Sequence, residues 1–97
     1  MPTKNQVIEM LETINDPELG VDIWTMGLIY GIDIRSDREI FIRLTFTTPA
    51  CPVGGIIKEE VADGMRLLGF EQVNIEVTFD PPWQPSPELK AALGFGS

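Results

Sequence analysis

The chain has 97 residues, of which 43% are hydrophobic and 23% charged, and this composition fits one globular domain. Its net charge of −8, without a basic cluster, argues against binding to nucleic acid. Because it contains no histidine, cysteine–histidine and serine–histidine catalysis within one chain are excluded, as is a zinc site with imidazole ligands.

Neither a membrane span nor a signal peptide is predicted. No apolar run approaches the ~18 residues that cross a bilayer, and the first residues, MPTKNQ, lack the apolar core of a signal peptide. The single cysteine, Cys51, cannot form an internal disulfide, which agrees with a reducing compartment. We therefore expect a cytoplasmic protein without membrane contact.

The first predicted element is an amphipathic helix of about three turns, ending before Asn15. Thr3 and Gln6 have the spacing of a capping box. The apolar residues recur at helical spacing; they are Val7, Leu11 and Ile14. A plain packing helix is expected here.

A turn is predicted to follow, because Pro17 disfavours helical backbone at Asp16 and Gly20 adds a second break. The turn brings two carboxylates, Asp16 and Glu18, close together. Two interpretations remain open on these residues alone. Either Asp16 caps its own backbone in a structural turn, or the loop carries a function.

Alternating apolar residues predict strands over 28–35 and 40–47, joined by a polar turn into an antiparallel hairpin. A helix is predicted over 53–68, with Gly64 allowing close approach to the sheet and Gly69 ending the helix. A third strand is predicted over 73–79.

The segment DPPWQP, residues 80–85, is predicted to be extended and stiff. Trp83 within it is either a lid on the core, the interpretation we favour, or a recognition residue. Ser86 is expected to cap a last short helix that begins with Pro87 and ends at Leu93.

The predicted element order is α-β-β-α-β-(α) in one domain spanning residues 1–97. This order indicates an α+β fold, a two-layer α/β sandwich with a three-stranded mixed sheet and helices on one face. We expect the first strand to lie between the other two.

Cys51 lies in the segment TPACPVGG, residues 48–55, between the second strand and the following helix. A thiol at a helix entrance lies in positive potential, which lowers its pKa and favours the nucleophilic, metal-binding thiolate. Gly54 and Gly55 are expected to leave this entrance unshielded. The alternative is that Cys51 is a small buried hydrophobic residue.

Three segments together resemble a known family. They are DPELGVDI with MGLIY at 16–23 and 26–30, LTFTTPACP at 44–52, and VTFDPPW at 77–83. Their order and spacing resemble the MIP-eighteen family (SufT and PaaD-like domains, or domain of unknown function fifty-nine) of the iron–sulfur cluster assembly domain-like superfamily. The resemblance extends from about Val7 to Trp83 and therefore covers nearly the whole chain.

The resemblance implies a factor in assembly or maturation of iron–sulfur (metal–sulfur) clusters, acting as a carrier or accessory protein and not as an enzyme. It implies contact with other cluster-assembly proteins and client iron–sulfur proteins, and allows a homodimer. One branch serves the oxidation of phenylacetyl-CoA. The family's characteristic positions are all kept in this chain; they are Asp16, Pro17, Glu18, Thr47, Thr48 and Cys51.

The chemistry of these residues agrees with such a role. Cys51 supplies one soft thiolate for iron, and Asp16 and Glu18 supply oxygen ligands or accept the thiol proton. Side chains around these ligands are expected to hold them in place; they are Thr47, Thr48, Pro17 and Leu19. Because a cluster normally takes four ligands, one chain cannot hold it alone. We expect a transient, shared iron–sulfur cluster or iron, or contact without a cluster.

Two other functions remain as alternatives. One is an acidic adaptor without its own metal, including a PaaD-like accessory subunit, with Trp83 as a contact residue. The other is a thiol enzyme, which the lack of a histidine base disfavours.

Overall fold

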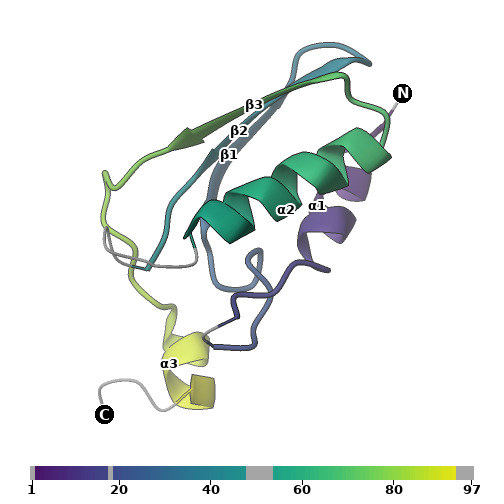
Figure 1. Ribbon diagram of the computed structural model, residues 1–97. Coiled ribbons are helices and arrows are strands. Elements are labelled where there is room, and N and C mark those ends of the chain that lie inside the picture. The colour runs from purple at the N-terminus through teal and green to yellow at the C-terminus, as the bar shows by residue number, and fades with distance from the viewer. Residues whose placement is uncertain (1, 18, 48–53, 94–97) are drawn as a thin grey trace.

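The computed structural model describes residues 2–17, 19–47 and 54–93. Figure 1 shows the elements in chain order. They are α1 (Lys4–Leu11), β1 (Ile29–Ile34), β2 (Glu39–Leu44), α2 (Gly54–Leu67), β3 (Gln72–Val77) and α3 (Pro87–Leu93). Within these ranges, no helix has both the length and the apolar character needed to cross a membrane.

The three strands form one mixed sheet in the order β1-β2-β3. β1 runs antiparallel to β2, and β3 runs parallel to β2, so the predicted hairpin and parallel crossover are confirmed. The prediction that the first strand lies in the middle is wrong. β2 takes the central position, and its helix-facing residues Ile40, Ile42 and Leu44 are at most 1% exposed. β1 is only half-buried, and its ladder is interrupted near Gly31, which suits an edge strand.

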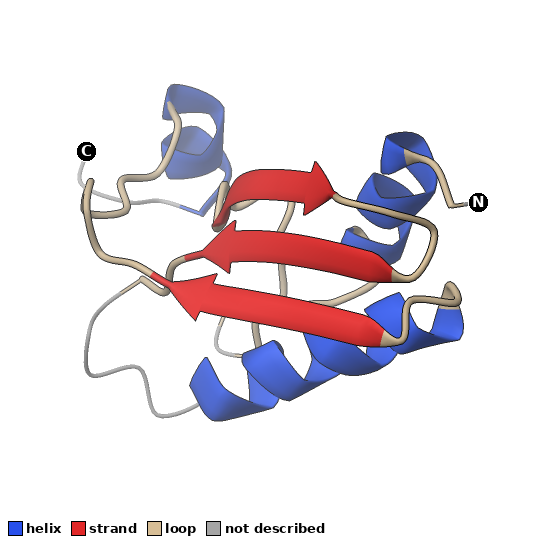
Figure 2. Cartoon of the chain, turned by 90° about the horizontal axis from the view of Figure 1, so that it is seen from above, coloured by secondary structure: helices blue, strands red, loops and turns tan. Residues whose placement is uncertain are grey.

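α1 and α2 cover the same face of the sheet, as Figures 1 and 2 show, which confirms the α+β, two-layer arrangement. The core lies between these helices and the sheet; its fully buried members include Val7, Leu11, Ile40, Ile42, Leu44, Ile57, Val61 and Met65. The opposite face is polar. Arg43 and Glu76 form an ion pair of 3.5 Å there, and both side chains are about half exposed.

α1 begins as predicted, with Thr3 and Gln6 forming a capping box. It is shorter than predicted, because Thr13 Oγ1 donates to Met10 O at 2.6 Å and the Ile14 carbonyl accepts from Ile23 N–H at 2.8 Å. The chain therefore leaves the helix to pair with the following loop, although Ile14 remains buried.

Gly64 lies where α2 crosses α1, not against the sheet as predicted. A Cβ at this position would lie 2.9 Å from Met10 Cγ of α1, which is closer than packing allows. The missing side chain therefore lets the two helices approach each other. Gly69 has φ of +110°, which favours glycine, and it follows α2 as predicted.

Residues 80–86, which we call the C-terminal strap, lie against the start of β1 and the loop that precedes it. Tyr30 Oη donates to Pro81 O at 2.8 Å, and Trp83 Nε1 donates to Met26 O at 2.6 Å. Trp83 is half-buried and packs against the core, which confirms the lid. Ser86 Oγ accepts from Leu89 N–H at 3.2 Å and caps α3.

Candidate functional site

A series of backbone hydrogen bonds joins the end of β2 to the loop between α1 and β1. Thr45 N–H donates to Leu28 O at 2.8 Å, Leu28 N–H to Ile23 O at 3.1 Å, and Ile23 N–H to Ile14 O at 2.8 Å. The turn that follows Ile14 is thereby held near the end of the sheet from which the chain leaves β2 and at which α2 begins (Figure 1). This turn therefore lies toward the same end of the molecule as the end of β2 and the start of α2.

Asp16 is buried in the first of these turns, with 2% of its surface exposed. Its backbone N–H donates to Val21 O at 2.9 Å, and its carbonyl accepts from Gly20 N–H at 2.8 Å. Its Oδ1 accepts from Leu19 N–H at 3.3 Å. A buried carboxylate is costly unless it is hydrogen-bonded, so these contacts explain how it is tolerated. The predicted capping of its own backbone is confirmed, and a function of the same carboxylate is compatible with it.

The other residues expected around the ligands differ in exposure. Pro17 is exposed, whereas Leu19 and Thr47 are half-buried. Glu18, Thr48 and Cys51 lie outside the described residues, so their roles as ligands or supporting groups stay predictions. Among the residues that the structure does describe, no three carboxylate, thiol or imidazole side chains gather closely enough to hold a metal ion.

An aromatic pair borders the start of α2. The ring of Phe46 lies 6.2 Å from that of Phe79, centroid to centroid, with 57° between the ring planes. A Cβ at Gly54 would lie only 2.7 Å from Phe46 Cε2, so Gly54 is covered by the ring. The expectation that both glycines are unshielded is wrong for Gly54, but Gly55 has open space around it.

The sequence reasoning missed this aromatic pair, although a signal for it exists. β2 and β3 are paired in a register that places Leu44 beside Val77. Continuing the same register by two residues along both chains places Phe46 beside Phe79. The parallel direction was predicted, so the missing information was that β3 lies directly beside β2.

Comparison with known proteins identifies the family. The sequence model of the iron–sulfur cluster assembly protein family matches residues 4–77. An Fe-S protein maturation auxiliary factor of Porphyromonas gingivalis is 34% identical over 99 residues, covering 98% of this chain and 94% of the relative. The Fe-S protein maturation auxiliary factor YitW of Bacillus subtilis is 36% identical over 95 residues, covering 94% and 93%.

Solved structures agree with this result. A conserved hypothetical protein of Thermotoga maritima has a TM-score of 0.83 at 38% identity, with 96% of this chain and 95% of the other covered. A domain of unknown function from Bacillus anthracis has a TM-score of 0.82 at 32% identity, with 96% and 92% covered. The resemblance found in the three motifs is confirmed. With its sequence matched over most of its length and its fold shared with these structures, the chain belongs to the iron–sulfur cluster assembly protein family.

Proposed function

We propose that this protein is an accessory or carrier factor in the maturation of iron–sulfur proteins, and that Cys51 binds iron or a cluster as cargo. Family membership over residues 4–77 supports the general role. The observation that supports the site is the buried Asp16 carboxylate, in a turn tied by hydrogen bonds to the end of β2, from which the chain continues to Cys51.

The proposed division of labour follows from the chemistry of the side chains. Cys51 supplies a thiolate, which binds iron once its proton is removed. Asp16 is oriented by the Leu19 amide, and its negative charge favours iron at a neighbouring thiolate and provides an acceptor for the thiol proton. Because the chain has one cysteine and no histidine, the remaining ligands come from a client or assembly protein, a second protomer or small thiols. Transfer then consists of ligand exchange at a shared site.

Anaerobic reconstitution tests the role of Cys51. Wild type, Cys51→Ala and Cys51→Ser are incubated with ferrous iron and sulfide, desalted and analysed for iron per protomer, visible absorption and native mass. We expect wild type to retain iron with sulfur-to-iron charge-transfer absorption and both variants to lose most of it, with unchanged circular dichroism. The native mass reports whether the iron is shared between protomers.

Equal iron retention in all three proteins would remove Cys51 as a ligand. The adaptor without its own metal is then favoured, and the exposed Pro81 and Pro82 of the C-terminal strap mark its candidate surface. Recovery of a client iron–sulfur protein by wild type, but not by Trp83→Ala, would support that function.

A further inference from the structure

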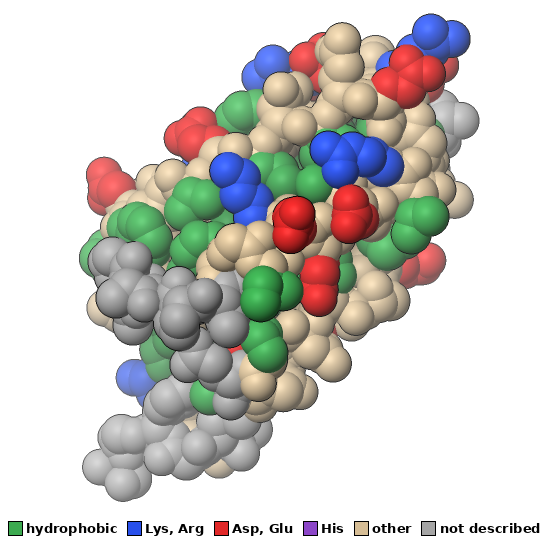
Figure 3. All heavy atoms as spheres, in the orientation of Figure 1, with side chains coloured by type: hydrophobic (Ala, Val, Ile, Leu, Met, Phe, Trp, Pro, Cys, Tyr) green, Lys and Arg blue, Asp and Glu red, His purple; other side chains and the backbone are tan. Residues whose placement is uncertain are grey.

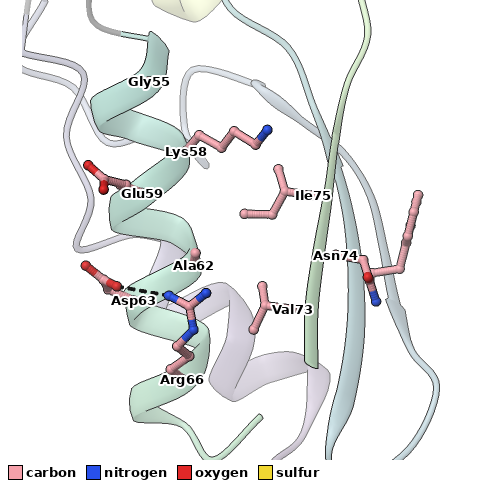
Figure 4. A pocket seen from close by; sticks show the side chains of 10 residues that line it. Gly55, Lys58, Glu59, Ala62, Asp63, Arg66, Val73, Asn74 and Ile75 are labelled. Carbon is pink, nitrogen blue, oxygen red and sulfur yellow. Dashed lines mark hydrogen bonds and ion pairs between the residues drawn. The ribbon is translucent and has the colours of Figure 1, made fainter. Parts of the chain in front are cut away.

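A groove of about 550 Å³ runs between α2 and β3, from Gly55 at the start of α2 to Arg66 near its end. Figure 4 shows Val73 and Ile75 of β3 facing α2 across it. On the helix side, Gly55 and Ala62 provide little side-chain volume, and a Cβ at Gly55 would meet nothing within 4 Å. The groove therefore has an apolar floor and room above it.

The basic and acidic side chains of α2 lie on different sides of the helix at this groove. Lys58 and Arg66 lie on the side of α2 that faces β3, whereas Glu59 and Asp63, also on the rim, point away from β3 (Figure 4). Figure 3 shows the same arrangement, with basic side chains bordering hydrophobic surface between α2 and the sheet and acidic ones beyond them. On a protein of net charge −8, two of the seven cations thus face one groove.

These cations are available to a ligand. Arg66 donates to Asp63 at 3.2 Å, but the two side chains are 58% and 73% exposed. An exposed pair of this kind contributes between about 0 and 1 kcal/mol, so Arg66 can turn to a second carboxylate at little cost.

β3 is the edge strand of the sheet that the described residues form, with β2 on one side only. An edge strand presents backbone N–H and C=O groups to which an extended segment can be added. The edge of β3, the apolar floor and the two cations lie together at this groove. We propose that the groove binds an extended, acidic peptide segment of a partner protein. This segment adds to the sheet alongside β3.

The spacing of the cations predicts the pattern of the segment. Lys58 and Arg66 are eight positions apart on α2, or about 12 Å along the helix axis. An extended chain covers about 13 Å in four residues, and its residues i, i+2 and i+4 point to the same side. The segment therefore carries acids at i and i+4 and a small apolar residue at i+2, which packs over Ala62, Val73 and Ile75.

A second copy of this chain fits the groove less well. Its own edge strand, QVNIEV, contains one acid, Glu76, and no acid four residues away within the strand. It would also bring a further −8 charge. The two cations at the groove therefore favour a segment of another protein that carries the predicted pattern. The proposal involves no metal and does not depend on the role of Cys51.

The test uses a blocked, fluorescent peptide, Thr-Glu-Thr-Val-Thr-Glu-Thr, with acids at i and i+4, and a second peptide of the same composition with acids at i and i+3. Binding is measured by fluorescence anisotropy at low salt, and contacts by amide chemical shifts. We expect the first peptide to bind up to about fivefold more tightly, with shifts concentrated in Gln72–Val77 and in the facing residues of α2.

Matched variants locate the site. We expect Lys58→Glu to weaken binding at least about fivefold, whereas Lys4→Glu, an equal charge change on α1, leaves it unchanged. Ala62→Phe fills the groove and abolishes binding, whereas Ala91→Phe on exposed α3 surface does not. Equal binding of the two peptides, shifts confined to residues outside β3 and α2, or equal effects of Lys58→Glu and Lys4→Glu would overturn the proposal. Self-association that Ala62→Phe abolishes, without peptide binding, would assign the groove to a second copy instead.

Discussion

Asp16 has a structural role in its turn, and we propose a chemical role for the same side chain. Its burial is explained by the turn, in which it accepts the Leu19 amide and joins the backbone bonds to Val21 and Gly20. The hydrogen bond from the Leu19 amide does not by itself require a negative charge, since a neutral amide oxygen accepts the same bond. The proposed function does use the charge, because iron at a thiolate is favoured by a nearby carboxylate.

Asp16→Asn separates the two roles. Because the oxygen that accepts from the Leu19 amide remains, we expect the protein to stay folded and the free energy of unfolding in urea to fall by at most about 1–3 kcal/mol. Iron retained per protomer in anaerobic reconstitution is expected to fall, since the carboxylate is lost. The control is Asp22→Asn, another turn carboxylate, which accepts Thr25 N–H at 2.8 Å. If Asp16→Asn and Asp22→Asn retained iron equally with wild type, the Asp16 carboxylate would be structural only.

Gly54 and Gly55 are neighbours with opposite surroundings, and they make a matched pair. Gly54→Ala places a methyl group 2.7 Å from the Phe46 ring, so we expect a loss of about 1–3 kcal/mol as the ring is displaced. Gly55→Ala meets nothing within 4 Å and is expected to be neutral or stabilising, because alanine favours the helix. Urea denaturation of both variants measures the difference. Equal stabilities would show that the ring moves aside without cost.

Among the elements, the C-terminal strap depends most on contacts far away in sequence. Trp83 and Met26 are 57 residues apart, and Pro81 and Tyr30 are 51 apart. The strap is not part of the sheet and has no strand hydrogen bonds, so these two bonds and the packing of Trp83 hold it in place. They connect β1 and the loop before it to the chain after β3.

Trp83→Phe tests how strongly the strap is held. It removes the bond to the Met26 carbonyl, in a residue that is only 2% exposed, so we expect a loss of about 1–3 kcal/mol in the free energy of unfolding. Tyr30→Phe removes an exposed bond to Pro81 and is expected to cost less, because water replaces the lost partner. Thermal and urea unfolding of both variants provide the comparison. A larger loss of unfolding free energy for Tyr30→Phe than for Trp83→Phe would contradict this expectation.

At the scale of the whole molecule, the sheet order decides which surfaces are available. With β2 in the centre, β3 is an edge strand beside α2, and the groove between them is open. If β1 were central, β3 would lie beside β1 and run antiparallel to it. The Phe46–Phe79 pair would then not form, because it needs β3 beside β2. The choice of β2 as the neighbour of β3 thus decides whether the aromatic pair at the start of α2 forms.

The sequence by itself determined the elements, the α+β class and the family. Helix starts such as Thr3 and Ser86 were predictable because a capping side chain bonds to backbone only three residues away. The alternation of apolar residues likewise depends on the geometry of each strand alone. Four-residue turns are equally local, and the capping by Asp16 was therefore within reach.

Only the tertiary structure decided which strand is central, which helix Gly64 contacts, and which carbonyl accepts the Trp83 hydrogen bond. These depend on contacts between residues far apart in the chain, such as Met10 with Gly64 and Met26 with Trp83. Ile34 and Ile40 have similar side chains, yet the first is half-buried at an edge and the second is fully buried in the centre. Their difference comes from the neighbours that each strand acquires on folding, which a local pattern does not contain.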